Sequence, residues 1–181
     1  MNERDSAPGG LALIEALVNT LDVETGADAL DTADGRAELA IAEQDAPAAR
    51  SLREALRTAC LAHAGHVPPG GEAVSLPDQP GGEAVSRLDR LLADAPLRVT
   101  VDETGVAALR PVEEPPGLTA RVAAAIATAS ADGTWDRLKV CEAADCRWAY
   151  YDRSPAGRRR WCSMSVCGAR AKMRTYRAKR G

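Results

Sequence analysis

The chain has 181 residues, 45% of them hydrophobic, which is enough for one domain or two small ones. Its net charge of −3 hides a division, because residues 136–181 carry 13 Arg or Lys against four Asp or Glu, a net +9, while residues 1–135 carry a net −12. The acidic part would repel nucleic acid, so contact with a polyanion is expected only from the basic C-terminal part.

Aromatic residues follow the same division. The chain has no Phe, and two of its three Trp and all three Tyr lie after residue 147. The first 130 or so residues must therefore build their core from Leu, Val, Ile and Ala, which favours close packing of helices through small residues.

Apolar residues at helical spacing predict a first helix over residues 10–22. Asn19 and Thr20 stand near its end, where two interpretations are open. They are either polar groups that line a ligand pocket or ordinary end-of-helix residues, and we favour the second. A loop over residues 23–34 and a short helix over 35–44 are predicted to follow.

The next helix is predicted to start near Pro47, after an acidic residue, and to run to about His63. Cys60 lies on its apolar stripe, so we interpret it as a small buried hydrophobic residue rather than a reactive thiol. His63 and His66 are candidates for metal binding or for a pH switch. End-of-helix roles are favoured, because no cysteine or carboxylate is arranged around them.

Four Pro and five Gly over residues 65–82 predict a flexible surface loop. A helix over 83–94 follows. Two short runs, 97–101 and 106–109, flank Asp102-Glu-Thr-Gly105, which is a β-hairpin signal with Gly where the turn can need a positive φ. An Ala-rich helix is then predicted over residues 118–130.

This order of elements predicts a mainly α N-terminal domain with one β-hairpin, spanning residues 1–134. The junction is placed at Ala131-Asp-Gly-Thr134, because charge and composition both change there. The remaining residues, 135–181, are predicted to form a small treble-clef-like zinc finger with four cysteine ligands.

Two close pairs of cysteines lead to the zinc prediction, in the pattern Cys141-x4-Cys146-x15-Cys162-x4-Cys167. Such spacing brings four thiolates to one tetrahedral structural Zn²⁺. The alternative is two disulfides, which are typical of secreted chains. We expect zinc and a cytoplasmic protein, since the sequence shows neither a secretory signal nor an apolar stretch long enough for a membrane span.

Within the finger, residues 142–145 are expected to form a tight knuckle whose backbone N–H groups point at the sulfurs. A strand over 148–152, a turn over 153–157 and a returning strand over 158–161 should follow. A helix over about 165–179 would then carry the last ligand in its first turn. Zinc is expected to supply most of the folding energy, because so small a unit lacks a sufficient core of its own.

The C-terminal motifs resemble those of the CGNR zinc finger, on the strength of Arg160-Trp-Cys162-Ser-Met164 and Cys167-Gly-x-Arg170-x-Lys172. In bacteria this finger usually follows a helical domain called ABATE, predicted to serve in stress-induced transcription regulators. The resemblance over residues 11–120 is looser and rests on Val18-Asn-Thr-Leu-Asp22 and on the domain order. The family's name-giving Asn is Ala169 here, which removes an amide able to pair with an adenine edge or a phosphate.

The basic residues of the finger are candidate nucleic-acid contacts. Arg170, Arg174 and Arg177 are expected to reach guanine edges or phosphates, since guanidinium groups bind both bidentately. Six others are expected to contact phosphates, namely Arg158, Arg159, Arg160, Lys172, Lys179 and Arg180. The alternative is a solvated basic face without a partner. Trp148 and Trp161 are expected to pack around the zinc rather than stack on bases.

These expectations favour a DNA-binding transcription regulator, with duplex DNA as its partner and an N-terminal domain that senses a small-molecule effector or forms a homodimer. An RNA-binding or acidic-protein-binding zinc module is the alternative. No enzymatic activity is expected, because four cysteines close the zinc coordination sphere and no pairing of a nucleophile with a base is visible.

Overall fold

The computed structural model describes the backbone of residues 6–64 and 81–180 and the side chains of residues 6–64 and 87–180. His66 and residues 65–80 of the predicted loop lie outside the described residues. The N-terminal helices are α1 (Leu11–Val18), α2 (Ala33–Glu38), α3 (Ala46–Ala62), α4 (Gly81–Ala93) and α5 (Leu118–Ala131). An antiparallel hairpin, β1 (Leu97–Val101) and β2 (Ala107–Pro111), separates α4 from α5.

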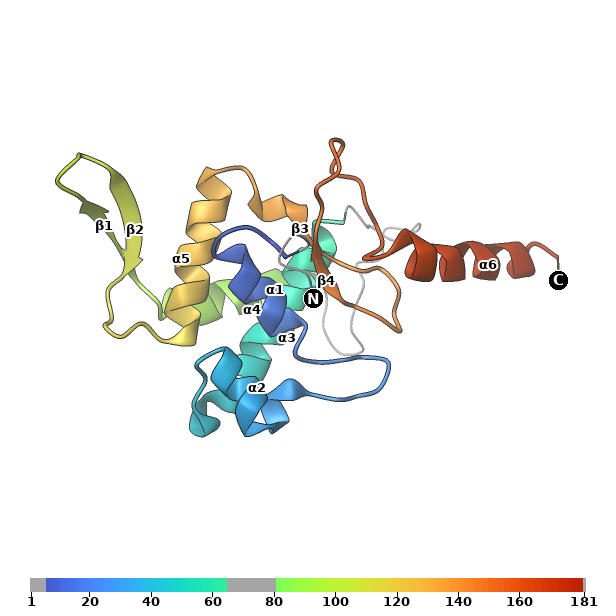
Figure 1. The fold of residues 1–181 in the computed structure, drawn as a ribbon, viewed down its shortest axis with the longest axis horizontal. Coiled ribbons are helices and arrows are strands. Elements are labelled where there is room, and N and C mark those ends of the chain that lie inside the picture. Colours follow the sequence, from blue (N-terminus) through green and yellow to red (C-terminus); the bar gives the residue numbers. More distant parts are fainter. Residues whose placement is uncertain (1–5, 65–80, 181) are drawn as a thin grey trace.

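The C-terminal part begins with a second antiparallel hairpin, β3 (Leu138–Val140) and β4 (Ala149–Tyr151). A π-helical turn (Met164–Gly168) then leads into α6 (Ala169–Ala178), which extends away from the rest of the protein (Figure 1). A mainly helical domain with one hairpin, followed by a small finger, is the fold class that the sequence predicts.

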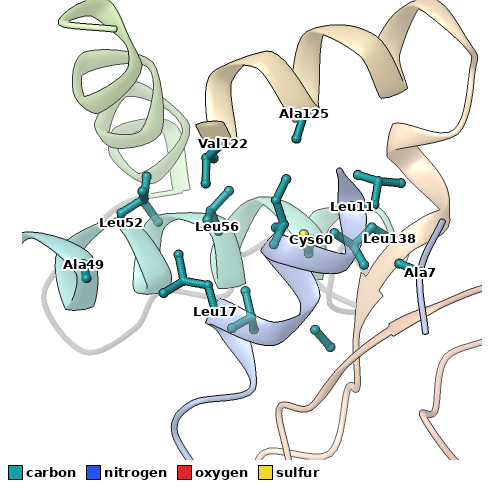
Figure 2. Packing of buried hydrophobic residues seen from close by; sticks show 14 of the residues in the cluster. Ala7, Leu11, Leu17, Ala49, Leu52, Leu56, Cys60, Val122, Ala125 and Leu138 are labelled. Carbon is teal, nitrogen blue, oxygen red and sulfur yellow. The ribbon is translucent and has the colours of Figure 1, made fainter. Parts of the chain in front are cut away.

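The main core lies between α1, α3 and α5, where Leu17, Leu56 and Val122 are fully buried. Figure 2 shows side chains from these three helices in one cluster with Leu138. The start of α1 approaches α5 so closely that a Cβ on Gly10 would stand 2.7 Å from the Cβ of Ala125. Small residues therefore allow this contact, as the Ala-rich composition predicts.

The core does not stop at the predicted domain junction. Leu138 and Val140 of β3 and Ala149 of β4 are at most 1% exposed and belong to the same buried cluster as the helices. Cys60 of α3 is fully buried in this cluster, which agrees with its interpretation as a hydrophobic residue. The root of the finger is thus built into the helical domain.

The first two helices differ from their predicted bounds. Helix α1 ends at Val18 rather than near residue 22, because Leu21 instead forms an isolated antiparallel bridge with Asp28. Helix α2 covers Ala33–Glu38 rather than 35–44, since the Thr32 hydroxyl caps it by accepting a bond from the Gly35 N–H.

The early end of α2 has an identifiable cause. Ala40 adopts a left-handed φ of +53°, and the N–H of Ile41 then bonds to the carbonyl of Arg36 at 2.9 Å. This is the Schellman arrangement that ends many helices, usually with Gly at the left-handed position. Because Ala stands there, the sequence carried no stop signal.

The predicted returning strand over residues 158–161 is wrong. No strand is assigned there, and the partner of β4 is β3, which precedes the knuckle. Residues 158–161 instead make isolated bonds, such as the one from the Glu142 N–H to the Arg160 carbonyl at 3.1 Å. The finger therefore closes its hairpin around the first cysteine pair.

Candidate functional site

The four C-terminal cysteines converge on one point. Their Sγ atoms all lie within 4.8 Å of one another, with 3.7 Å between Cys146 and Cys162 and 3.8 Å between Cys162 and Cys167. Sulfurs at about 2.3 Å from a tetrahedral Zn²⁺ stand roughly 3.8 Å apart. No disulfide joins any of the five cysteines, and one cluster of four sulfurs favours a metal over two separate disulfides. The donor set fits one structural zinc, as predicted.

Short local bonds position the first cysteine pair. Cys141 directly follows β3, and the carbonyl of Ala143 accepts bonds from the N–H groups of Cys146 and Arg147, at 3.0 and 3.1 Å. Arg147 has a φ of +52°, which is uncommon for a residue with a Cβ. Its guanidinium also bonds to the Glu142 carbonyl at 3.2 Å. The knuckle is thus a tight turn, as predicted.

The second cysteine pair spans the π-helical turn. Ser163 caps this turn by accepting a bond from the Val166 N–H. Gly168 follows Cys167, and a Cβ there would stand 3.1 Å from Met164 and 3.3 Å from the Trp161 ring. This crowding favours glycine in the Cys-Gly motif, because a larger residue would press on the Met164 side chain and the Trp161 ring.

The metal-free thiols cannot all ionise together. Hydrogen bonds from the Cys146 and Cys162 thiols, helped by backbone N–H groups, lower the pKa of Cys141 well below that of a free thiol. The bonds to Cys141 in turn raise the pKa values of Cys146 and Cys162. At neutral pH these two thiols hold protons that zinc must displace.

A buried ion pair organises the turn that follows β4. Asp152 is fully buried, and its carboxylate accepts bonds from Lys139 at 3.1 Å, from the Arg159 N–H at 2.9 Å and from Ser154. Burial acts to raise the pKa of Asp152, but the bonds from Ser154, Arg159 and Lys139 outweigh it and lower the pKa to about 2. No local pattern in the sequence indicates this ion pair between Lys139 and Asp152.

Asn19 and Thr20 make contacts within the protein. The Asn19 amide bonds to the backbone of Ala149 in β4. The Thr20 hydroxyl donates to the Leu17 carbonyl at 2.8 Å and accepts a bond from Arg53 at 3.0 Å. Only the bond from Thr20 to Leu17 is a local contact of a helix end, and the others join distant segments. Ligand binding by these two residues stays a prediction.

His63 is the C-cap of α3 and lies against the finger. Its Nδ1 stands 2.8 Å from the Leu138 carbonyl, and its ring meets that of Trp135 edge-on at 4.9 Å. Burial lowers the pKa of His63. It stands apart from the cysteine cluster, the one metal-ligating group found among the described residues.

The nine predicted nucleic-acid contacts fall into two groups. Arg159 is half-buried, donates to the Cys162 carbonyl at 2.8 Å and lies over the Tyr150 ring, while Arg160 forms a two-pronged pair with Glu142 at 2.7–2.8 Å. These two help to hold the finger together. Arg160 is nevertheless exposed, as are the other seven, namely Arg158, Arg170, Lys172, Arg174, Arg177, Lys179 and Arg180.

Six of these seven lie on α6 or just after it. The helix has no buried residue, and residues 169–180 include no acid. On one side, Arg170 stands 3.5 Å from Glu24 and 3.9 Å from Asp145. On the other side, Lys172 and Lys179 border an open groove of about 650 Å³ that also reaches Trp161. Cations therefore lie on two sides of the helix, which also exposes the apolar Met173 and Tyr176.

Comparison with known families gives two matches. Residues 11–133 match the ABATE family model, described as "Putative stress-induced transcription regulator", and residues 137–180 match the CGNR zinc finger. No curated protein matches the chain. Among the described residues, every helix is too short or too polar to cross a membrane.

Proposed function

From a chain that belongs to the ABATE family and ends in a CGNR zinc finger, we propose a transcription regulator that binds duplex DNA through α6. The structural zinc centre holds the start of this helix in place, because Cys167 lies in the turn that leads into it. Zinc has no catalytic position here, since four sulfurs complete its coordination. The proposed activity is DNA binding by the Arg and Lys side chains of the finger.

The exposure of α6 carries this proposal. A ten-residue helix without a buried side chain is marginal in water, because packing of an apolar face supplies most helical stability in proteins. Such a helix is stabilised by a partner that surrounds it. The DNA major groove, about 12 Å wide, accepts a helix about 10–12 Å across and lines it with phosphates.

The arrangement of cations on α6 fits such a groove. Arg170, Arg174 and Arg177 recur at helical spacing and border one groove, while Lys172 and Lys179 border a second groove that Arg174 also reaches. We assign base edges and nearby phosphates to the arginines and the far strand's phosphates to the lysines. Ala169 is exposed at the first position of the helix, where its methyl group offers no hydrogen bond to a base.

We assign the regulatory part to the N-terminal domain, as a sensor of a small-molecule effector. The shared core supports this assignment, because β3 and β4 pack among the same buried residues as α1 and α3. A change in the packing of these helices would move the root of the finger. Binding of an effector could therefore change the position of α6 without any flexible linker.

The test is binding of fluorescent duplex DNA by the full zinc-loaded chain, before and after chelation. If about five phosphates are neutralised, the logarithm of the binding constant should fall with the logarithm of salt at a slope near −4.5. Arg174→Ala should reduce the steepness of this slope by about 1. Arg110→Ala, an exposed arginine of β2, is the matched control and should change nothing.

Two outcomes would overturn the proposal. One is an affinity that is unaffected by chelation or by salt. The other is tighter binding to structured RNA or to polyglutamate than to duplex DNA of matched length, which would make the finger an RNA-binding or protein-binding module.

A further inference from the structure

The β1–β2 hairpin projects beyond α5 at the opposite end of the protein from α6 (Figure 1). Large apolar residues are exposed on it, with Val99 at 70%, Val101 at 64% and Val106 at 61%. Exposed valines on adjacent positions of a two-stranded sheet are unusual for a free surface. This hairpin, residues 97–111, is called the projecting hairpin below.

Val99 and Val101 belong to one wholly apolar face of the hairpin. The register pairs Leu97 with Pro111, Val99 with Leu109 and Val101 with Ala107, so these six side chains lie on the same side. Only the root of this face is covered, where Leu97 packs against Ala residues at the end of α4 and on α5. The outer part carries no charge.

The backbone of β1 is also open along its outer edge. Asp102 bonds to Val106, and the Val112 N–H bonds to the Pro96 carbonyl. Since bonded pairs alternate along an antiparallel ladder, Val99 and Val101 direct their N–H and C=O groups away from β2. No third strand joins this sheet among the described residues. The outer edge of β2, in contrast, ends at Pro111, which has no N–H to donate.

The charges on β1 are self-complementary. If two copies of β1 run antiparallel about a two-fold axis at Thr100, each Val99 stands opposite Val101 of the second copy. The same register places Arg98 opposite Asp102 of the second copy. Oδ1 of Asp102 already accepts bonds from Thr104 and Val106, so the carboxylate is held in place. Within one chain, Arg98 forms an ion pair with Glu114 at 3.3 Å. This pair is exposed and weak, so Arg98 can exchange Glu114 for Asp102 of the second copy.

We propose that a second copy of this chain pairs along β1, joining two projecting hairpins into one four-stranded sheet. The interface is isologous, because each chain gives the same strand. It contains four backbone hydrogen bonds between Val99 and Val101 of the two copies and two Arg98–Asp102 ion pairs, and it extends the apolar face across both chains. The dimer forms without zinc contacts or DNA, so it stands apart from the proposed function.

Proline substitution at directly opposed positions tests the edge. Val99→Pro removes an outward N–H of β1, while Leu109→Pro removes the corresponding outward N–H of β2 from the same cross-strand pair. Sedimentation of the full zinc-loaded chain between about 1 and 100 µM should show a dimer for wild type and for Leu109→Pro. Val99→Pro should raise the dimer dissociation constant at least tenfold.

A monomeric wild type at 100 µM would overturn the proposal, as would equal effects of the two prolines or a larger effect of Leu109→Pro. A charge exchange covers the case in which a proline prevents folding. Arg98→Glu and Asp102→Lys should each weaken self-association, and an equimolar mixture of the two variants should restore it as a heterodimer. A mixture no tighter than either variant alone would count against the proposal. Arg110→Glu is the control, because Arg110 faces the same side from β2 but lies off the paired edge.

Discussion

Asn19 and Ala149, which lie 130 residues apart in the sequence, are joined by two hydrogen bonds. The Asn19 Nδ2 donates to the Ala149 carbonyl at 3.0 Å, and the Ala149 N–H donates to the Asn19 Oδ1 at 2.7 Å. The amide thereby satisfies both backbone groups of Ala149, which point away from β3, as a neighbouring strand would. Arg57 adds a second connection, from the Val18 carbonyl at 2.9 Å to the Arg147 carbonyl at 3.4 Å. Together they fix the finger to the end of α1.

Asn19→Ala should therefore lower the free energy of unfolding. Two bonds at about 1–1.5 kcal/mol each are lost and the backbone of Ala149 is left without its partner, so we expect a loss of about 2–3 kcal/mol. Urea unfolding of the zinc-loaded chain measures it. Gln44→Ala removes an exposed amide and should change stability by less than about 0.5 kcal/mol. Equal losses for the two variants would contradict the structural role of Asn19.

Zinc content should depend on the clustered cysteines alone. Cys162→Ala removes one of four sulfurs and should abolish tight zinc binding, because the remaining three leave the coordination open. Cys60→Ala is the matched control and should keep one zinc per chain, since burial in the core raises the pKa of Cys60 to about 12 and leaves that thiol inert. Elemental analysis of the purified, reduced proteins decides between these outcomes. Zinc retained by Cys162→Ala would be incompatible with a four-sulfur site.

Asp152 should give a pH-dependent contribution to stability. Its folded pKa, about 2, lies below the ordinary value of 3.8, so the carboxylate stabilises the fold fully above about pH 4. This contribution is worth about 2 kcal/mol and is lost as the pH falls through about 2. Asp152→Asn also leaves Lys139 buried without its charge partner, so we expect a loss of about 3 kcal/mol at pH 7.

Urea unfolding of wild type and Asp152→Asn between pH 7 and pH 2 measures this difference. Both proteins lose zinc over the same range, so the difference between them isolates the carboxylate. It should stay constant down to about pH 4 and then shrink. Asp132→Asn, which alters an exposed acid at the end of α5, is the control and should show no such trend. If the difference in unfolding free energy between wild type and Asp152→Asn does not change with pH, the titration of Asp152 is ruled out.

Glu24 competes with DNA for Arg170 in the proposed function. The pair is exposed and 3.5 Å long, so it is worth less than about 1 kcal/mol. Glu24→Gln should raise the affinity for duplex DNA about two- to five-fold at low salt, and this gain should fade as salt screens the charges. Glu113→Gln removes an equal charge beyond β2 and should leave binding unchanged. Equal gains for both variants would show that net charge alone matters.

Local patterns in the sequence predicted the features that neighbouring residues determine. The cysteine spacing predicted the zinc centre, and the Asp102–Gly105 turn predicted the first hairpin, in which Gly105 has a φ of +82°. The apolar stripe of α3, which includes Cys60, was also confirmed. Each of these signals lies within a few residues or in one repeated spacing.

Features set by distant contacts could not be read in the same way. Nothing near Asn19 indicates that its amide completes β4, because the partner is Ala149. The strand that pairs with β4 was misassigned, since Arg158–Trp161 and Leu138–Val140 both look compatible with a strand and only the shared core selects the second. Lys139, buried against Asp152, looked like one more surface cation.

The shared core affects how the protein unfolds, because it includes Leu138, Val140 and Ala149 of the finger. A fragment that starts at residue 135 would expose these three side chains to water, and the helices left behind would have a gap in their packing. Losing the metal should therefore loosen the helical half as well, in a single cooperative transition. Metal supply would then control the lifetime of the whole chain in the presence of proteases, and not only the shape of its C-terminal end.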